Sequence, residues 1–215
     1  MIGIINPIHM NNRFFWDKMS KSYDKQVNKT YAQAYTDTIE HAKKYLNQES
    51  QVLDVACGTG LTTIPLSHFV HSITALDISE GMIMQVRKKT DQDNIQNIIL
   101  RTGDIFQPEL QAESFDVIMT FNLLYFLKDP QEHLKRIHQL LKPGGYFLSA
   151  TDCMGDHLSF KTRIQVFMSR IGLLPWMSAL KSPQLVKMIK TEKFDITDVI
   201  TLHQKPTNLF IAAKK

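Results

Sequence analysis

The chain has 215 residues, of which 43% are hydrophobic and 21% charged, and its formal net charge is +4. This composition excludes a disordered chain, and 9 Gly and 8 Pro are too few for a fibrous repeat. No apolar stretch approaches the roughly 18 residues of a membrane span, and the first residues do not form a secretory signal. Cys57 and Cys153 lie too far apart in sequence for a disulfide framework, so we expect free thiols and a cytoplasmic protein.

The predicted elements, taken in chain order, alternate helix-like stretches with short apolar runs. Helices are expected over 29–47, 61–70, 80–89 and 130–141, strands over 51–56, 72–77, 96–100, 114–121 and 146–151, and a final hairpin over 196–203 and 208–213. Such alternation is typical of an α/β fold in which helices cover both faces of a doubly wound, mainly parallel sheet. The length predicts a single domain, residues 1–215.

The alternation is interrupted after the fifth predicted strand. Residues 153–192 contain an apolar stripe at helical spacing, a Leu-Leu-Pro-Trp-Met run and a second helix that begins at Ser182-Pro183. We expect a helical cap insertion here rather than a second domain. From Cys153 to Lys190 there are six basic residues and one acid, a net charge of +5. This charge is compatible with a solvated face, an anionic acceptor or peripheral contact with acidic lipids.

Gly58 and Gly60 follow the predicted strand 51–56 and precede a helix. Glycines at such a turn let the backbone adopt positive φ and approach a ligand, and the helix N-terminus offers free N–H groups. A dinucleotide-binding fingerprint has a third glycine where this chain has Thr63. Asp54, just before the loop, would repel a pyrophosphate but would attract an ammonium group. The turn therefore favours a cationic nucleoside over a dinucleotide.

Two further acids follow neighbouring strands. Asp77 ends the second predicted strand, where an acid commonly holds ribose hydroxyls. Asp104 follows the third, where it can accept from the adenine amine while the Ile105 N–H donates to a ring nitrogen. The carboxyl ends of these strands meet at one edge of the sheet. The donors that these acids require occur together in S-adenosylmethionine, which carries an ammonium and a sulfonium.

The sequence resembles the class I S-adenosylmethionine-dependent methyltransferases. The segments that carry the resemblance are VLDVACGTG at 52–60, LDISEGM at 76–82, GDIF at 103–106, FDVI at 115–118 and LKPGGYF at 141–147. Residues 15–24, FWDKMSKSYD, are similar to the N-terminal stretch of quinone- and small-molecule-modifying members. The resemblance implies a Rossmann-like sheet of seven strands with an antiparallel final strand, S-adenosylmethionine as cofactor, and residues 1–28 as an N-terminal lid segment.

Together with the acids and the glycine turn, the resemblance implies a cofactor site on the strand-end loops and the lid segment. Its expected members are Tyr23, Asp54, Ala56, Gly58, Gly60, Asp77, Ile78, Met82, Asp104, Ile105, Asn122 and Tyr125. No catalytic residue is assigned, although Tyr23, Asp152 and His157 are candidates for a general base. The histidines lack a cysteine or acid at ligand spacing, so we expect no metal site.

We expect methyl transfer to a small-molecule acceptor of apolar or anionic character, without an obligate protein partner. Nucleic acid is a less favoured substrate because Phe121–Tyr125 reads FNLLY, not the Asn/Asp-Pro-Pro-aromatic motif of amino-directed enzymes. Two alternatives stay open, a nucleic-acid methyltransferase that uses the basic cap and a non-catalytic regulatory protein that binds the cofactor. A nicotinamide enzyme is disfavoured by Asp54 and Thr63.

Overall fold

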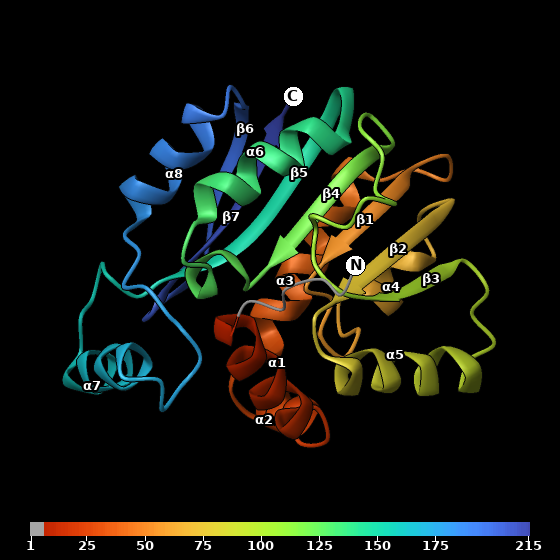
Figure 1. Ribbon diagram of the computed structural model, residues 1–215. Helices are drawn as coiled ribbons and strands as arrows, with labels where there is room; N and C mark the ends of the chain where they lie inside the picture. The colour runs from red at the N-terminus through yellow and green to blue at the C-terminus, as the bar shows by residue number, and fades with distance from the viewer. Residues whose placement is uncertain (1–6) are drawn as a thin grey trace.

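The computed structural model describes residues 7–215 and is built around one twisted sheet (Figure 1). Residues 1–6 of the expected N-terminal lid segment lie outside the described residues. The sheet has seven strands in the order β3-β2-β1-β4-β5-β7-β6. The strands are β1 (Gln51–Val55), β2 (Ser72–Asp77), β3 (Ile98–Thr102), β4 (Phe115–Phe121), β5 (Leu141–Cys153), β6 (Asp195–Gln204) and β7 (Thr207–Lys214).

The pairing of the strands confirms the expected fold class. β1 to β5 are parallel, β7 runs antiparallel to β5, and β6 runs antiparallel to β7. The strand order reverses between β1 and β4, so the loops that follow these two strands turn to opposite faces of the sheet. In open α/β sheets this switch point is where a ligand crevice forms.

Helices cover both faces of the sheet. They are α1 (Pro7–Met19), α2 (Tyr23–Thr30), α3 (Ala32–Ala42), α4 (Thr63–Ser67), α5 (Glu80–Gln92), α6 (Pro130–Leu140), α7 (Phe160–Arg170), α8 (Ser182–Thr191) and the short 3-10 helices η1 (Lys43–Tyr45) and η2 (Leu124–Phe126). One core packs α6 and α8 against the face that carries Leu53, and the other packs α3, α4 and α5 against the face that carries Val52. β1 is thus buried on both faces, as its continuous apolar run predicts.

Several boundaries differ from the prediction, and two of these differences have a clear local cause. The expected helix 29–47 is divided, because Tyr31 leaves helical geometry with φ −128° and separates α2 from α3. Residues 143–145, Pro-Gly-Gly, were expected to separate a helix from a strand that begins at 146. Instead β5 begins at Leu141 directly after α6, and its pairing with β4 is irregular between Phe115 and Val117. The Pro-Gly-Gly turn is accommodated within the strand, where Gly144 adopts φ +79°.

The segment expected to form a cap contains two helices with different surroundings. α8 packs beside α6 on the sheet, whereas α7 lies beyond the carboxyl end of β5, away from the sheet (Figure 1). The chain leaves and re-enters the fold at a narrow neck, where the Gly155 N–H donates to the Leu180 carbonyl over 2.8 Å. A Cβ added to Gly155 would lie 2.3 Å from the Ala179 carbonyl oxygen, so only glycine permits this approach. Residues 156–179 therefore form a projection whose two ends meet at this neck.

Candidate functional site

A cavity of about 310 Å³ lies at the carboxyl edge of the sheet, where β1, β2 and β4 end. Its walls come from the loops after these strands, from α1 and α2, and from the start of α6. The lining residues are Asn12, Trp16, Tyr23, Val55, Ala56, Gly58, Asp77, Ile78, Met82, Gly103, Asp104, Ile105, Phe121, Asn122, Leu123, Phe126, Leu127, Lys128, Asp129, Glu132 and His133. Its volume lies at the lower end of the range for small-ligand pockets, roughly 300–1,000 Å³.

The glycine loop bends sharply against the end of β2. Ala56, Gly58 and Gly60 adopt φ values of 62°, 56° and 82°. A Cβ on Gly58 would meet no atom within 4 Å, which leaves bare backbone beside the cavity. A Cβ on Gly60 would instead press on Ile64 and Val86 at 3.1 and 3.2 Å. Gly58 thus provides close access for a ligand, whereas Gly60 allows tight packing behind the loop and does not line the cavity.

Asp77 is held by two backbone donors. Its carboxylate accepts from the N–H of Gly58 and from the N–H of Ser79, each over 2.9 Å. The side chain is 7% exposed and lines the cavity. Burial raises its pKa to about 6, although both backbone hydrogen bonds act in the opposite direction. An additional donor from a ligand would stabilise this poorly solvated carboxylate.

Asp54 is placed behind the glycine loop and not on the cavity wall. It is 2% exposed and accepts a hydrogen bond from the Thr63 hydroxyl over 2.7 Å. Burial raises its pKa to about 7, opposed by that hydrogen bond, and the neighbouring Asp77 raises it further. Thr63, the residue that breaks the dinucleotide fingerprint, is therefore the hydrogen-bond donor to this acid.

The next group of predicted residues surrounds the middle of the cavity. Ile78 and Met82 border it from the loop and helix after β2, and Asp104 and Ile105 border it from the loop after β3. Asp104 accepts from the Phe106 N–H over 2.9 Å, which orients its carboxylate. Apolar side chains on two sides with a carboxylate between them suit a flat, amine-bearing base.

Side chains of the N-terminal helices close one side of the cavity. Asp17 of α1 accepts from the Gly81 N–H over 2.9 Å and from the Ser79 hydroxyl over 2.6 Å. Trp16 lines the cavity and contacts Phe126 edge to face at 5.2 Å between ring centres. The sequence interpretation missed Trp16, although it lies within the similar segment 15–24. That segment was the only signal available for it.

A polar cluster borders the cavity where β4, β5 and β7 meet. The hydroxyls of Tyr23 and Tyr35 lie 3.0 Å apart. Asn122, with φ +58°, accepts from the Asn208 side-chain amide over 3.3 Å, and the same amide donates to Asp152 over 2.7 Å. The side-chain oxygen of Asn208 is buried without a hydrogen-bond partner. Burial raises the pKa of Asp152 and of Tyr23.

The structure brings nine of the twelve predicted cofactor residues to the cavity wall. These are Tyr23, Ala56, Gly58, Asp77, Ile78, Met82, Asp104, Ile105 and Asn122. The other three, Asp54, Gly60 and Tyr125, lie behind the wall. Tyr125 is 8% exposed and packs within the apolar core on the α6 side of the sheet. The role of each residue toward the cofactor stays a prediction.

The three candidate bases are placed differently. Tyr23 lines the cavity, but its raised pKa keeps the hydroxyl protonated at neutral pH. Asp152 and His157 do not line the cavity, and His157 is exposed in the loop before α7. His133 at the start of α6 does line it, and burial lowers its pKa. Among residues 7–215, no three His, Cys, Asp or Glu side chains gather in a way that could hold a metal ion.

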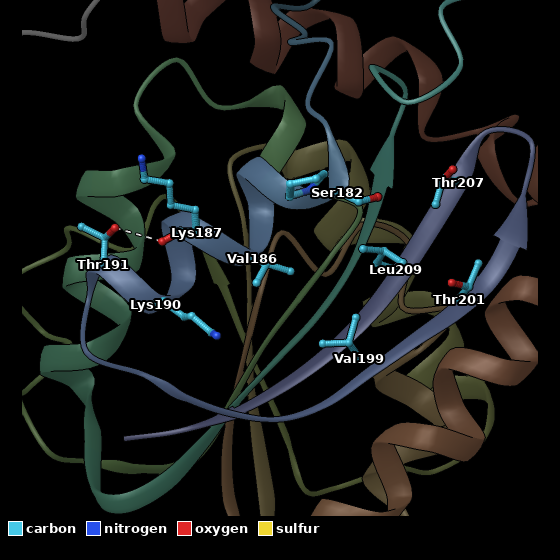
Figure 2. A pocket seen from close by; sticks show the side chains of 10 residues that line it. Ser182, Val186, Lys187, Lys190, Thr191, Val199, Thr201, Thr207 and Leu209 are labelled. Carbon is cyan, nitrogen blue, oxygen red and sulfur yellow. Dashed lines mark hydrogen bonds between the residues drawn. The ribbon is translucent and has the colours of Figure 1, made fainter.

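A second hollow of about 750 Å³ lies between α8 and the last two strands. Figure 2 shows Val186 of α8 across the hollow from Val199 of β6 and Leu209 of β7, with Lys187 and Lys190 along the helix. Lys187 also accepts, through its carbonyl, the Thr191 hydroxyl over 2.9 Å. None of the twelve predicted cofactor residues borders this hollow.

In the part of the chain that the structure describes, no helix is both long and apolar enough to cross a bilayer.

The chain matches known proteins in the segment that forms this cavity. Residues 53–149 match the family described as "Methyltransferase domain". The chain is 29% identical over 150 residues to malonyl-[acyl-carrier protein] O-methyltransferase of Priestia megaterium, covering 69% of this chain and 53% of that protein. It is 28% identical over 192 residues to demethylmenaquinone methyltransferase of Staphylococcus epidermidis, covering 87% and 79%. The chain thus spans about half the length of the first relative.

The fold is also similar to that of solved structures. Phosphoethanolamine N-methyltransferase 2 of Haemonchus contortus, in complex with S-adenosyl-L-methionine, has a TM-score of 0.71 at 17% identity, covering 84% of this chain and 52% of that one. At this identity the likeness concerns the fold alone. It agrees with the seven-stranded sheet described above.

Proposed function

We propose that the chain is an S-adenosylmethionine-dependent methyltransferase and that it methylates a small-molecule acceptor. The observation that carries this proposal is the cavity at the switch point of the sheet. It joins carboxylates at the ends of β2 and β3 to an aromatic wall from α1 and η2. One side suits the cofactor and the other side suits an acceptor.

The residues on the first side fit the cofactor. Gly58 leaves bare backbone beside Asp77, so a ribose can approach both the carboxylate and the loop. Asp104 offers an acceptor to the adenine amine between the apolar side chains of Ile78 and Ile105. The buried carboxylates of Asp54 and Asp77 make this end of the cavity favourable for a cation. When bound, the cofactor supplies a methyl group already activated on a sulfonium.

The second side of the cavity would orient the acceptor. Trp16, Phe126 and Leu127 present an apolar wall, so we propose an acceptor with an apolar or aromatic body. The Tyr23 hydroxyl, held by Tyr35 and kept protonated by burial, donates a hydrogen bond to the acceptor atom. The main contribution of the protein is to place the acceptor atom in line with the methyl group in a water-poor cavity. Orientation of this kind lowers the reaction barrier by roughly 7–11 kcal/mol.

None of the three candidates from the sequence is assigned as a general base, because Tyr23 stays protonated and neither Asp152 nor His157 lines the cavity. Without a base, the acceptor is one that is already ionised at neutral pH, such as an acidic phenol, an acidic enol or a carboxylate. Asn208, bonded to both Asp152 and Asn122, is a positioning residue that fixes the cavity wall. A nucleic-acid substrate is disfavoured, because the wall on the acceptor side of the cavity is apolar and not basic.

The lid segment and the cap are part of the same proposal. We propose that α1 and α2 close over the bound cofactor through Asp17, Asp24 and Trp16. We propose that residues 156–179 cover the acceptor side, because Trp176 donates to the Leu127 carbonyl over 3.2 Å and Ser178 to the Tyr125 carbonyl over 2.8 Å. α8 packs on the sheet and supports this cap. The two buried free thiols, Cys57 and Cys153, favour a cytoplasmic location.

The test combines binding with turnover. Calorimetry with S-adenosylhomocysteine on Asp77→Ala should show at least about tenfold weaker binding, since a buried charge-assisted hydrogen bond is lost. Asp116→Ala is the matched control, because Asp116 pairs with Lys142 at the opposite edge of the sheet. Release of S-adenosylhomocysteine from labelled cofactor is then measured with phenolic, enolic and carboxylate acceptors. Unchanged binding in Asp77→Ala would refute the cofactor site, and binding without turnover on any acceptor would favour a regulatory protein.

A further inference from the structure

The solvent-facing side of α7 is apolar, which inverts the usual pattern of a surface helix. Four exposed apolar residues follow one another at intervals of four, three and four residues. They are Phe160 (79% exposed), Ile164 (43%), Phe167 (62%) and Ile171 (55%). The side that faces the protein carries Ser169 instead, 5% exposed, whose hydroxyl donates to the Val166 carbonyl over 2.8 Å. The apolar residues of α7 therefore do not build the core.

Exposed apolar residues also precede and follow the helix in sequence. Leu158, before α7, is 42% exposed, and Leu173, after it, is 65% exposed. Contiguous apolar surface of this kind on a folded domain marks a contact site, whereas single exposed apolar residues do not. We define the α7 surface as Leu158, Phe160, Ile164, Phe167, Ile171 and Leu173.

Basic side chains flank the α7 surface. Arg163 and Arg170, two turns apart, lie on one side of the apolar row, and Lys161 lies on the other; all three are exposed. No Asp or Glu occurs between Asp156 and Glu192. The flanking charge is therefore of one sign, which complements an anionic partner and repels an identical copy of the same surface.

The position of the α7 surface in the fold is equally specific. Residues 156–179 project from the neck at Gly155, so α7 can contact a flat partner without obstruction by the sheet (Figure 1). The chain just after α7 returns to the cavity, where Trp176 bonds the carbonyl of Leu127, a cavity-lining residue. A partner bound at α7 would thus lie beside the acceptor side of the cavity.

We propose that α7 docks the protein onto the surface of an anionic lipid bilayer. The phenylalanines and isoleucines insert at the boundary between headgroups and acyl chains, and the basic residues contact lipid phosphates. Nucleic acid is not favoured as the partner, because the centre of the surface is bulky and apolar while its charges lie at the edges. The docking of α7 does not depend on the proposed function. The further idea that an apolar acceptor enters the cavity from the bilayer does rest on it.

The experiment is co-sedimentation of the full chain with vesicles of phosphatidylcholine alone and of equal parts phosphatidylcholine and phosphatidylglycerol. We expect binding to the anionic vesicles that weakens as salt is added. Phe160→Ser combined with Phe167→Ser should weaken it at least about tenfold, since two exposed aromatic side chains no longer insert. The matched control is Met84→Ser on α5, which is 59% exposed and distant in sequence. It should bind as the parent does.

A second pair of variants tests the charge. Arg163→Gln with Arg170→Gln should weaken binding about tenfold, whereas Lys88→Gln on α5 should leave it unchanged. Equal binding to both vesicle types, or no binding to either, overturns the proposal. So does a dimer in light scattering that the Phe160→Ser and Phe167→Ser pair dissociates, or RNA binding that only the arginine variants abolish. Calorimetry with S-adenosylhomocysteine on the same variants should show unchanged affinity, which separates this proposal from the cofactor site.

Discussion

Asp24 of α2 and Lys89 of α5 form an ion pair with 2.6 Å between carboxylate oxygen and ammonium nitrogen. Lys89 also donates to the Thr59 carbonyl over 2.8 Å, and the Thr59 hydroxyl donates to Asp24. The three residues tie an N-terminal helix directly to the glycine loop. This contact holds a segment that is remote in sequence against the loop that borders the cavity.

The first prediction concerns this tie. Asp24→Ala should accelerate dissociation of S-adenosylhomocysteine and weaken its binding several-fold, because α2 loses its anchor on the loop. A partly buried pair contributes roughly 1 kcal/mol, which corresponds to about fivefold. Stopped-flow fluorescence of Trp16 measures the dissociation rate. Asp37→Ala, on α3, is the control, and equal rates in the two variants would contradict the lid role of α2.

The second prediction concerns the stability of the ligand-free protein. Because the pKa of Asp54 rises to about 7 in the fold from about 3.8 when exposed, the folded state binds the proton more tightly. The contribution of Asp54 to the stability of the parent protein should therefore fall as pH rises from about 4 to about 7. Asp54→Asn lacks this penalty, so its melting temperature should exceed that of the parent by more at pH 8 than at pH 5. Thermal unfolding at both values measures it.

The control for this experiment is Asp93→Asn, at the exposed end of α5. Its effect on the melting temperature should not follow the profile of Asp54→Asn. A constant difference between Asp54→Asn and the parent across this pH range would show that Asp54 is ionised in the fold throughout.

The third prediction links protons to the cofactor. A bound cation and ribose donors favour the ionised forms of Asp54 and Asp77, whose pKa values are raised to about 7 and about 6. Binding near pH 6 should therefore release protons, and affinity for S-adenosylmethionine should increase from pH 5 to pH 8. Calorimetry in buffers of different ionisation enthalpy counts the protons. Proton uptake, or affinity independent of pH, would contradict the proposed match of charges.

The fourth prediction concerns the neck of the projection. Gly155→Ala places a Cβ 2.3 Å from the Ala179 carbonyl oxygen, so the two chain segments must separate. We expect a loss of roughly 1–3 kcal/mol in unfolding free energy, the usual cost of overpacking. Acceptor affinity should fall while cofactor affinity stays unchanged, since only the cap is displaced. Gly172→Ala, where no atom lies within 4 Å, is the control, with the backbone strain of its φ of +77° as the sole cost.

Local patterns carried most of the fold prediction. The β-branched run before Gly58 and the alternation of strands and helices predicted β1 and a mainly parallel sheet, because buried strands need continuous apolar sequence. The seven strands and the antiparallel final strand were implied by the family resemblance and not by local patterns. The same reasoning did not find that Asp54 and Tyr125 lie behind the cavity wall. A residue at a strand end or in the following turn can point to either side, and only the packing of the next element decides which.

The surroundings of the cavity could not be derived from local patterns either. Trp16, Lys89 and Asn208 come from three separate parts of the chain, and no spacing rule connects them to the glycine loop. The apolar stripe from Phe160 to Ile171 shows helical spacing in the sequence, but that spacing does not say which way the stripe faces. In the structure it faces solvent, because the neck at Gly155 carries α7 away from the sheet.

The sequence by itself determined the fold class, the glycine turn and the acids at three strand ends, since these depend on neighbours within a few residues. Only the tertiary structure decided which carboxylates reach the cavity, how α2 is tied to the loop and which way α7 faces. Those features arise from contacts between residues distant in the chain, such as Asp24 with Lys89 and Gly155 with Leu180. Contacts of that kind are settled by packing and burial, not by local propensity.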